Sequence, residues 1–141
     1  MSEATLVLTW QPAEAELQVV KAGVTNHGRA LAGNDARPVA CFARQAGRLL
    51  GGAIGRLERG RLFVEYLWVE ERRRGQGLGS RLLAALEEAA KEAGANSALL
   101  DTLLDDTAAL YQRRGYAVLA QVPDYVPGFN RWILLKPLGP V

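Results

Sequence analysis

Residues 67–94 read LWVEERRRGQGLGSRLLAALEEAAKEAG, and this stretch decides the fold. It begins as an apolar strand and passes through three arginines and three alternating glycines. From Gly77 onward, apolar residues recur at helical spacing while charged residues occupy the other side, and Gly94 is a natural end for the helix. A strand, a glycine-rich turn and an amphipathic helix in this order indicate an α/β protein.

The three glycines need an explanation, because glycine within a helix costs about 1 kcal/mol relative to alanine. They stand between a strand and a helix, where unpaired backbone N–H groups point outward and the helix dipole is positive. Gly75, Gly77 and Gly79 let oxygen atoms approach the main chain closely, and the arginines at 72–74 raise the local positive potential. We therefore predict a phosphate or pyrophosphate site; the alternative is a flexible turn beside a solvated basic segment.

Two common phosphate-binding motifs do not fit this stretch. A P-loop requires a lysine directly after its last glycine, and no lysine follows these glycines. A dinucleotide-binding loop has the pattern G-x-G-x-x-G/A, but Ser80 takes the third position when the pattern starts at Gly75, and Leu82 takes it when the pattern starts at Gly77. In that motif the preceding strand also ends closer to the first glycine than it does here. Hydrolysis of ATP or GTP is therefore disfavoured.

Further strands and helices are expected on both sides of the stretch. Upstream, we expect an antiparallel meander of three strands over residues 38–45, 48–58 and 60–71. Downstream, we expect a buried strand, a short helix and two more strands, over residues 97–104, 106–114, 116–122 and 130–138. A turn containing Pro123, Pro127 and Gly128 precedes the last strand.

The N-terminal part is expected to contribute a short strand and a helix. The strand covers residues 5–10, the helix begins at Pro12 and runs to residue 24, and residues 25–35 are loop-rich or weakly helical. The whole chain then forms one α/β domain over residues 1–141. Its sheet is antiparallel at the start and has a parallel crossover between the strand ending at Val69 and the strand ending near Thr102.

Composition excludes several classes of protein. The chain has 141 residues, 49% hydrophobic and 23% charged, which suits one domain with a sizeable core. A formal charge of +2 is too mild to indicate nucleic-acid binding, and no apolar run is long enough to span a membrane. Cys41 is the only cysteine, so no internal disulfide can form, and we expect a cytoplasmic protein in which Cys41 is a small core residue.

The glycine loop resembles the acetyl-CoA loop of the GNAT acetyltransferase superfamily, written Gln/Arg-x-x-Gly-x-Gly/Ala and matched by Arg74, Gly77 and Gly79. Two other segments support the resemblance. ALYQRRGY at 109–116 is similar to the family's second motif, and DYVPGFNRWILLKPL at 124–138 is similar to the end of one of its subgroups. The resemblance covers roughly residues 38–138 and implies the GNAT fold: a mixed central sheet of about six to seven strands with a parallel central pair, flanked by helices.

The resemblance also implies a function. The protein would be an N-acetyltransferase that binds acetyl-CoA and an amine together, and the amine would attack the thioester directly. A small-molecule amine is favoured over a protein amine, no metal is expected, and a homodimer is possible. By motif position, the residues that bind acetyl-CoA are Leu67, Val69, Arg74, Gly75, Gln76, Gly77, Leu78, Gly79 and Ser80.

Three residues are assigned to catalysis. The resemblance places the backbone N–H of Leu67 against the thioester oxygen and makes Tyr111 the donor of a proton to the leaving sulfur. Glu65, two residues before Leu67, is expected to take a proton from the amine if a bulge turns it toward the cleft. Asp101 and His27 are the alternatives for this base.

The acceptor is expected to contact His27 and an aromatic wall of Tyr125, Phe129 and Trp132, although Trp132 could instead pack in the core. The chain departs from the family at two positions. Leu104 stands where many relatives have asparagine, and Phe129 stands where the subgroup has histidine, which implies a changed acceptor specificity. Two other functions stay open: a non-catalytic acyl-CoA sensor and a binder of another phosphorylated ligand.

Overall fold

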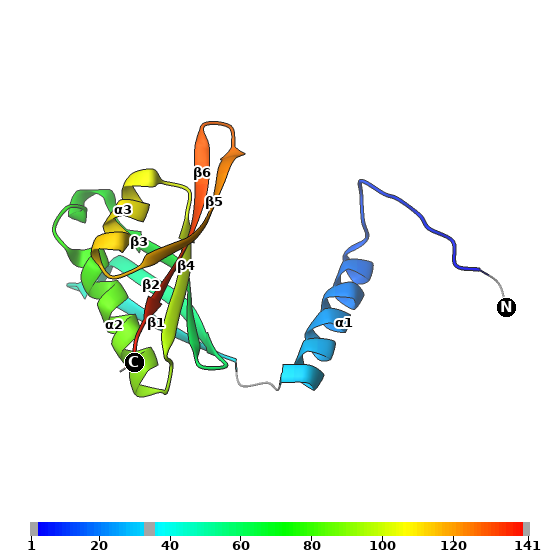
Figure 1. Cartoon of the computed structure of the whole chain (residues 1–141), viewed down its shortest axis with the longest axis horizontal. Coiled ribbons are helices and arrows are strands. Elements are labelled where there is room, and N and C mark those ends of the chain that lie inside the picture. The colour runs from blue at the N-terminus through cyan, green and yellow to red at the C-terminus, as the bar shows by residue number, and fades with distance from the viewer. Residues whose placement is uncertain (1–2, 33–35, 140–141) are drawn as a thin grey trace. The chain divides into compact units, whose positions relative to one another are not determined.

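The computed structural model describes residues 3–32 and 36–139 (Figure 1). The chain divides into two compact units, Met1–Asn34 and Asp35–Val141, each with its own internal contacts. Among the described residues, none of the helices combines the length and apolar character needed to cross a bilayer. The second unit carries the sheet and the glycine loop, whereas a single domain over the whole chain stays a prediction.

Among its described residues, the first unit contains one helix, α1 (Glu14–Ala32), which includes His27. The helix continues through residues 25–32, which were expected to be loop-rich or weakly helical; residues 33–35 lie outside the described part. The predicted strand over residues 5–10 is wrong, because residues 3–13 contain no strand. An apolar segment becomes a strand only when a neighbouring strand pairs with its backbone, and this unit supplies no such neighbour among its described residues.

The second unit is a six-stranded sheet in the order β1-β2-β3-β4-β6-β5. Its strands are β1 (Arg37–Gln45), β2 (Arg48–Glu58), β3 (Arg61–Val69), β4 (Ser97–Thr102), β5 (Ala117–Val126) and β6 (Phe129–Pro137). Only β3 and β4 pair in parallel; the other neighbours are antiparallel. The predicted mixed sheet is confirmed, but Pro123 lies within β5 and the turn before β6 contains only Pro127 and Gly128.

Two helices, α2 (Leu78–Glu92) and α3 (Asp105–Arg113), pack along one face of this sheet (Figure 1). Leu86 of α2 and Leu62 and Leu134 of the sheet are the largest fully buried side chains. A short 3-10 helix, η1 (Glu71–Arg73), and the glycine loop connect β3 to α2. The apolar face of each element decides this packing, since it leaves water only when it contacts the common core.

The sheet opens at one point into a fork between β3 and β4. The two strands pair only over Arg61–Phe63 with Ser97–Leu99, although both continue beyond these residues. On its other edge β3 has a bulge: Gly55 pairs with Val64 and Ile54 pairs with Tyr66, so Glu65 is left without a partner. A bulge bends a strand and increases its twist, which accounts for the divergence of β3 from β4.

Gly55 makes the bulge possible, because a Cβ atom at this position would collide with the backbone oxygen of Phe63. We predict that Gly55→Ala destabilises the protein by about 1–3 kcal/mol, as overpacking against backbone does. Thermal unfolding should show a loss of several degrees. Gly52→Ala is the matched control on the same strand, because its nearest contact is the Phe42 side chain at 3.0 Å, which can move. Equal stability of the two variants would contradict the role of Gly55.

Candidate active site

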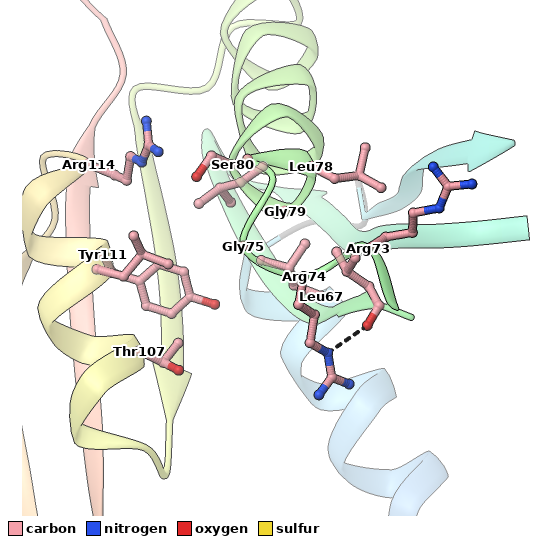
Figure 2. Close-up of a pocket in the computed structure, with 14 residues that line it drawn as sticks. Leu67, Arg73, Arg74, Gly75, Leu78, Gly79, Ser80, Thr107, Tyr111 and Arg114 are labelled. Carbon is pink, nitrogen blue, oxygen red and sulfur yellow. Dashed lines mark hydrogen bonds between the residues drawn. The ribbon is translucent and has the colours of Figure 1, made fainter. Parts of the chain in front are cut away.

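A cavity of about 460 Å³ lies between the end of β3, the glycine loop and α3 (Figure 2). Tyr111 and Leu67 line it from opposite sides, and α2 begins at its edge. The structure thus brings together most of the residues predicted from the two sequence motifs. These are Leu67, Val69, Arg74, Gly75, Gly77, Leu78, Gly79, Ser80 and Tyr111.

The glycine loop leaves the start of α2 open. Gly75 and Gly77 have φ angles of +77° and +82°, which only glycine adopts without strain. Gly77 is the residue before α2, and no side chain forms a hydrogen bond that caps the helix there. The first N–H groups of the helix, from Leu78 to Ser80, therefore keep their donors for a ligand, and the helix dipole favours a negatively charged one.

Arginines surround this opening, and two of them also brace the loop. Arg74 Nε donates to the backbone oxygen of Val69 at 2.9 Å, the bond drawn as a dashed line in Figure 2. Arg73 is held by Gln45 and by an ion pair of 3.7 Å with Glu70. The carbonyl of Val69 thus already accepts one hydrogen bond from the glycine loop.

The cavity also has lining residues that the motifs did not predict, namely Leu83, Thr107, Leu110 and Arg114. Thr107 and Arg114 line it from α3 and from the residue just after that helix. Arg114 directly precedes Gly115 in the second motif, so a cation at that position was the available signal. Gln76 was predicted to bind acetyl-CoA but is not among the residues that line the cavity. Its side chain instead donates to the backbone oxygen of Arg72 at 3.4 Å.

Tyr111 extends from α3 toward the glycine loop (Figure 2) and is only 7% exposed. Its ring lies 5.8 Å from that of Tyr116. Burial raises the pKa of Tyr111 above its ordinary value, and the negative charge of Asp101 raises this pKa further. The phenol therefore stays protonated at neutral pH, and a protonated phenol in a cavity can donate.

A second cavity, of about 330 Å³, lies at the fork and shares Leu67, Thr107 and Tyr111 with the first. Glu65, the unpaired residue of the bulge, lines it together with Asp101 of β4. The carboxylate of Glu65 pairs with Arg56 at 3.4 Å, and that of Asp101 pairs with Arg131 at 2.8 Å. The structure thus brings Glu65, Asp101 and Tyr111 to one cavity.

The three residues of the predicted aromatic wall lie in three different environments. Tyr125 lies against the guanidinium of Arg131, 5.1 Å from the ring centre. Phe129 is 47% exposed and lines a third cavity. The indole Nε1 of Trp132 donates to Asp105 at 2.7 Å, and its ring packs against the core, as the alternative reading of the sequence proposed.

His27 belongs to α1 in the first unit, so its assignment stays a prediction. Within residues 3–32 and 36–139, no group of three or more His, Cys, Asp or Glu side chains is arranged to hold a metal ion. Cys41 is partly buried and packs against the core.

Comparisons with known proteins agree on one family. Residues 7–116 match the family described as Acetyltransferase (GNAT) family. Blasticidin-S acetyltransferase of Streptomyces morookaense is 39% identical over 109 residues, covering 74% of this chain and 80% of the relative. Acetyltransferase Atu2258 of Agrobacterium fabrum is 39% identical over 72 residues, 51% of this chain and 53% of the relative. The crystal structure of an acetyltransferase from Bacillus cereus is 26% identical, with a TM-score of 0.83 and coverage of 94% and 98% of the two chains.

Proposed function

The chain belongs to the acetyltransferase (GNAT) family, and on this premise we propose that it transfers the acetyl group of acetyl-CoA to a primary amine within a ternary complex. One observation carries the proposal: the two cavities meet at Leu67 and Tyr111 and differ in charge. The charged side chains lining the first are Arg73, Arg74 and Arg114, and those lining the second are Glu65 and Asp101. An anionic donor and a cationic acceptor would each meet the opposite charge.

The first cavity suits the donor. The open N–H groups at the start of α2 would bind the diphosphate, with Arg73 and Arg114 adding positive charge. Acetyl-CoA supplies the thioester carbonyl that the amine attacks. The backbone N–H of Leu67, at the fork, is the donor that we assign to the carbonyl oxygen, where it would stabilise developing negative charge.

The second cavity suits the acceptor. An amine is mostly protonated at neutral pH and must lose a proton before it can attack. We assign this step to Glu65, and two observations support it: Glu65 is the unpaired residue of the bulge, and it lines the same cavity as Tyr111. Tyr111 would then protonate the leaving sulfur. A cavity of about 330 Å³ fits a small molecule better than an ordered protein segment, and small-molecule amines are therefore the preferred class.

The test is an assay of CoA release with acetyl-CoA and a panel of amines. The panel includes polyamines, aminoglycosides, amino acids and peptide N-termini, and it starts with blasticidin S, the acceptor in the name of the Streptomyces relative. We expect turnover with at least one small amine, and thermal stabilisation by acetyl-CoA but not by ATP or NAD. Tight acetyl-CoA binding without turnover on any class would instead indicate a non-catalytic sensor. Equal stabilisation by ATP would contradict the donor assignment.

A further inference from the structure

Asp101 is held by a partner on the neighbouring strand, and that partner has a support of its own. Arg131, on the neighbouring strand β6, donates from Nε to Asp101 Oδ2 at 2.8 Å. Tyr125 supports Arg131 in turn, since its hydroxyl accepts from Nη1 at 3.4 Å and its ring lies 5.1 Å from the guanidinium. The Asp101 side chain nevertheless stays 45% exposed at the fork, so it can still accept a further donor.

The proposed reaction requires two proton transfers from the acceptor nitrogen. An ammonium group has three N–H bonds and the product amide keeps one, so two protons leave the nitrogen. The first leaves before attack, and Glu65 is assigned to it. The second leaves after the new C–N bond has formed and the C–S bond breaks. The sulfur takes up one proton, so one of the two is returned to the reaction and the other is released to water.

We propose that Asp101 takes the second proton from the acceptor nitrogen and returns it to Tyr111. The N–H bond breaks as an O–H bond forms on the Asp101 carboxylate, and Tyr111 gives its own proton to the leaving thiolate. The proton on Asp101 then passes to the Tyr111 phenolate, which restores both groups for the next turnover. Arg131 and Tyr125 are positioning residues that act through Asp101. This inference rests on the proposed acetyl transfer.

The geometry and the charges support this relay. Asp101, Glu65 and Tyr111 line one cavity, and the Asp101 charge contributes to the raised pKa of Tyr111, after burial. A phenolate with a raised pKa is a much stronger base than a carboxylate, so the transfer of the proton from Asp101 to the Tyr111 phenolate is energetically favourable. The other ionisable residues that line the two cavities with Tyr111 are Glu65 and Tyr66 in the second cavity and Arg73, Arg74 and Arg114 in the first, and the ring of Tyr116 lies 5.8 Å from that of Tyr111.

A kinetic comparison tests the relay with the best acceptor from the panel. We expect Asp101→Asn, which keeps the size of the side chain and removes its charge and basicity, to lower kcat by about tenfold to a hundredfold. The Kd of acetyl-CoA should stay within about twofold. Arg131→Ala should lower kcat by part of that factor and Arg131→Lys should recover some of it. Glu88→Gln, an exposed change on α2, is the control expected to leave kcat unchanged.

A second measurement needs no acceptor. Carbon-13 NMR of the tyrosine Cζ atoms follows the ionisation of Tyr111, assigned by its loss in Tyr111→Phe, while circular dichroism confirms the fold. Because the negative charge of Asp101 disfavours the phenolate, Asp101→Asn should start the Tyr111 transition at lower pH than in the unmodified protein. Glu88→Gln should not move it.

The outcomes separate the two proposals. If the unmodified protein acetylates no amine, the proposed function fails, whatever the NMR shows. If it acetylates an amine and Asp101→Asn keeps kcat within twofold, acetyl transfer stands and the relay is overturned. An unmoved Tyr111 transition in Asp101→Asn would equally overturn the relay, because Asp101 would then not act on Tyr111.

Discussion

Replacing Tyr111 with phenylalanine is expected to lower kcat by two to four orders of magnitude, the range that a positioned general acid contributes. The phenol is 7% exposed and held protonated by burial, so it can donate to the sulfur in a site that water enters poorly. Phenylalanine keeps the ring and its packing against Tyr116, at 5.8 Å, and removes only the donor. Steady-state kinetics with the best acceptor, together with calorimetric titration of acetyl-CoA, measure the effect. The Kd should change by less than about twofold.

Tyr116→Phe is the matched control for this prediction. The Tyr116 hydroxyl donates to Glu87 at 2.6 Å, and Lys136 donates to the same carboxylate at 3.0 Å. Loss of one partner of the mostly buried Glu87 should cost about 1–3 kcal/mol of stability and leave kcat nearly unchanged. The two variants therefore separate catalysis from packing. Turnover by Tyr111→Phe at the normal rate would remove Tyr111 from the acid role.

Gly77→Val is expected to weaken acetyl-CoA binding by at least about a hundredfold. The loop would lose two or more charge-assisted hydrogen bonds to the diphosphate, and each factor of ten corresponds to about 1.4 kcal/mol. A branched side chain beside the first N–H groups of α2 would keep phosphate oxygens away from them. The fold should survive, because no atom lies within 4 Å of a Cβ placed at Gly77, although its φ of +82° adds strain of about 1–2 kcal/mol. Isothermal titration calorimetry gives the Kd.

Gly47→Val controls for that strain. Gly47 lies in the turn between β1 and β2, has a φ of +79° and has no atom within 4 Å of a Cβ placed there. It should lose a similar amount of stability and bind acetyl-CoA normally. Normal binding by Gly77→Val would show that the ligand does not approach this part of the loop, and the donor assignment would have to move elsewhere.

The elements of the second unit were predictable because their signals are local. Helical spacing after Gly77, turn residues between the strands and a continuous apolar run at residues 98–100 each act over a few neighbours. The glycine loop and Tyr111 were found for the same reason, since each belongs to a short motif. The strand expected over residues 5–10 failed because a strand, unlike a helix, completes its hydrogen bonds only with a partner.

For the second unit, the sequence by itself determined which elements form and in which order, and that an open helix start follows three alternating glycines. Only the tertiary structure decided which side chains share a cavity. The unpaired position of Glu65 depends on the register between β2 and β3, and the meeting of Asp101 with Arg131 depends on β6 inserting beside β4. The hydrogen bond from Arg74 to the Val69 carbonyl and the position of Arg114 beside the first cavity also depend on the tertiary structure. Register, strand order and divergence arise from contacts between residues far apart in the chain, and no local pattern records them.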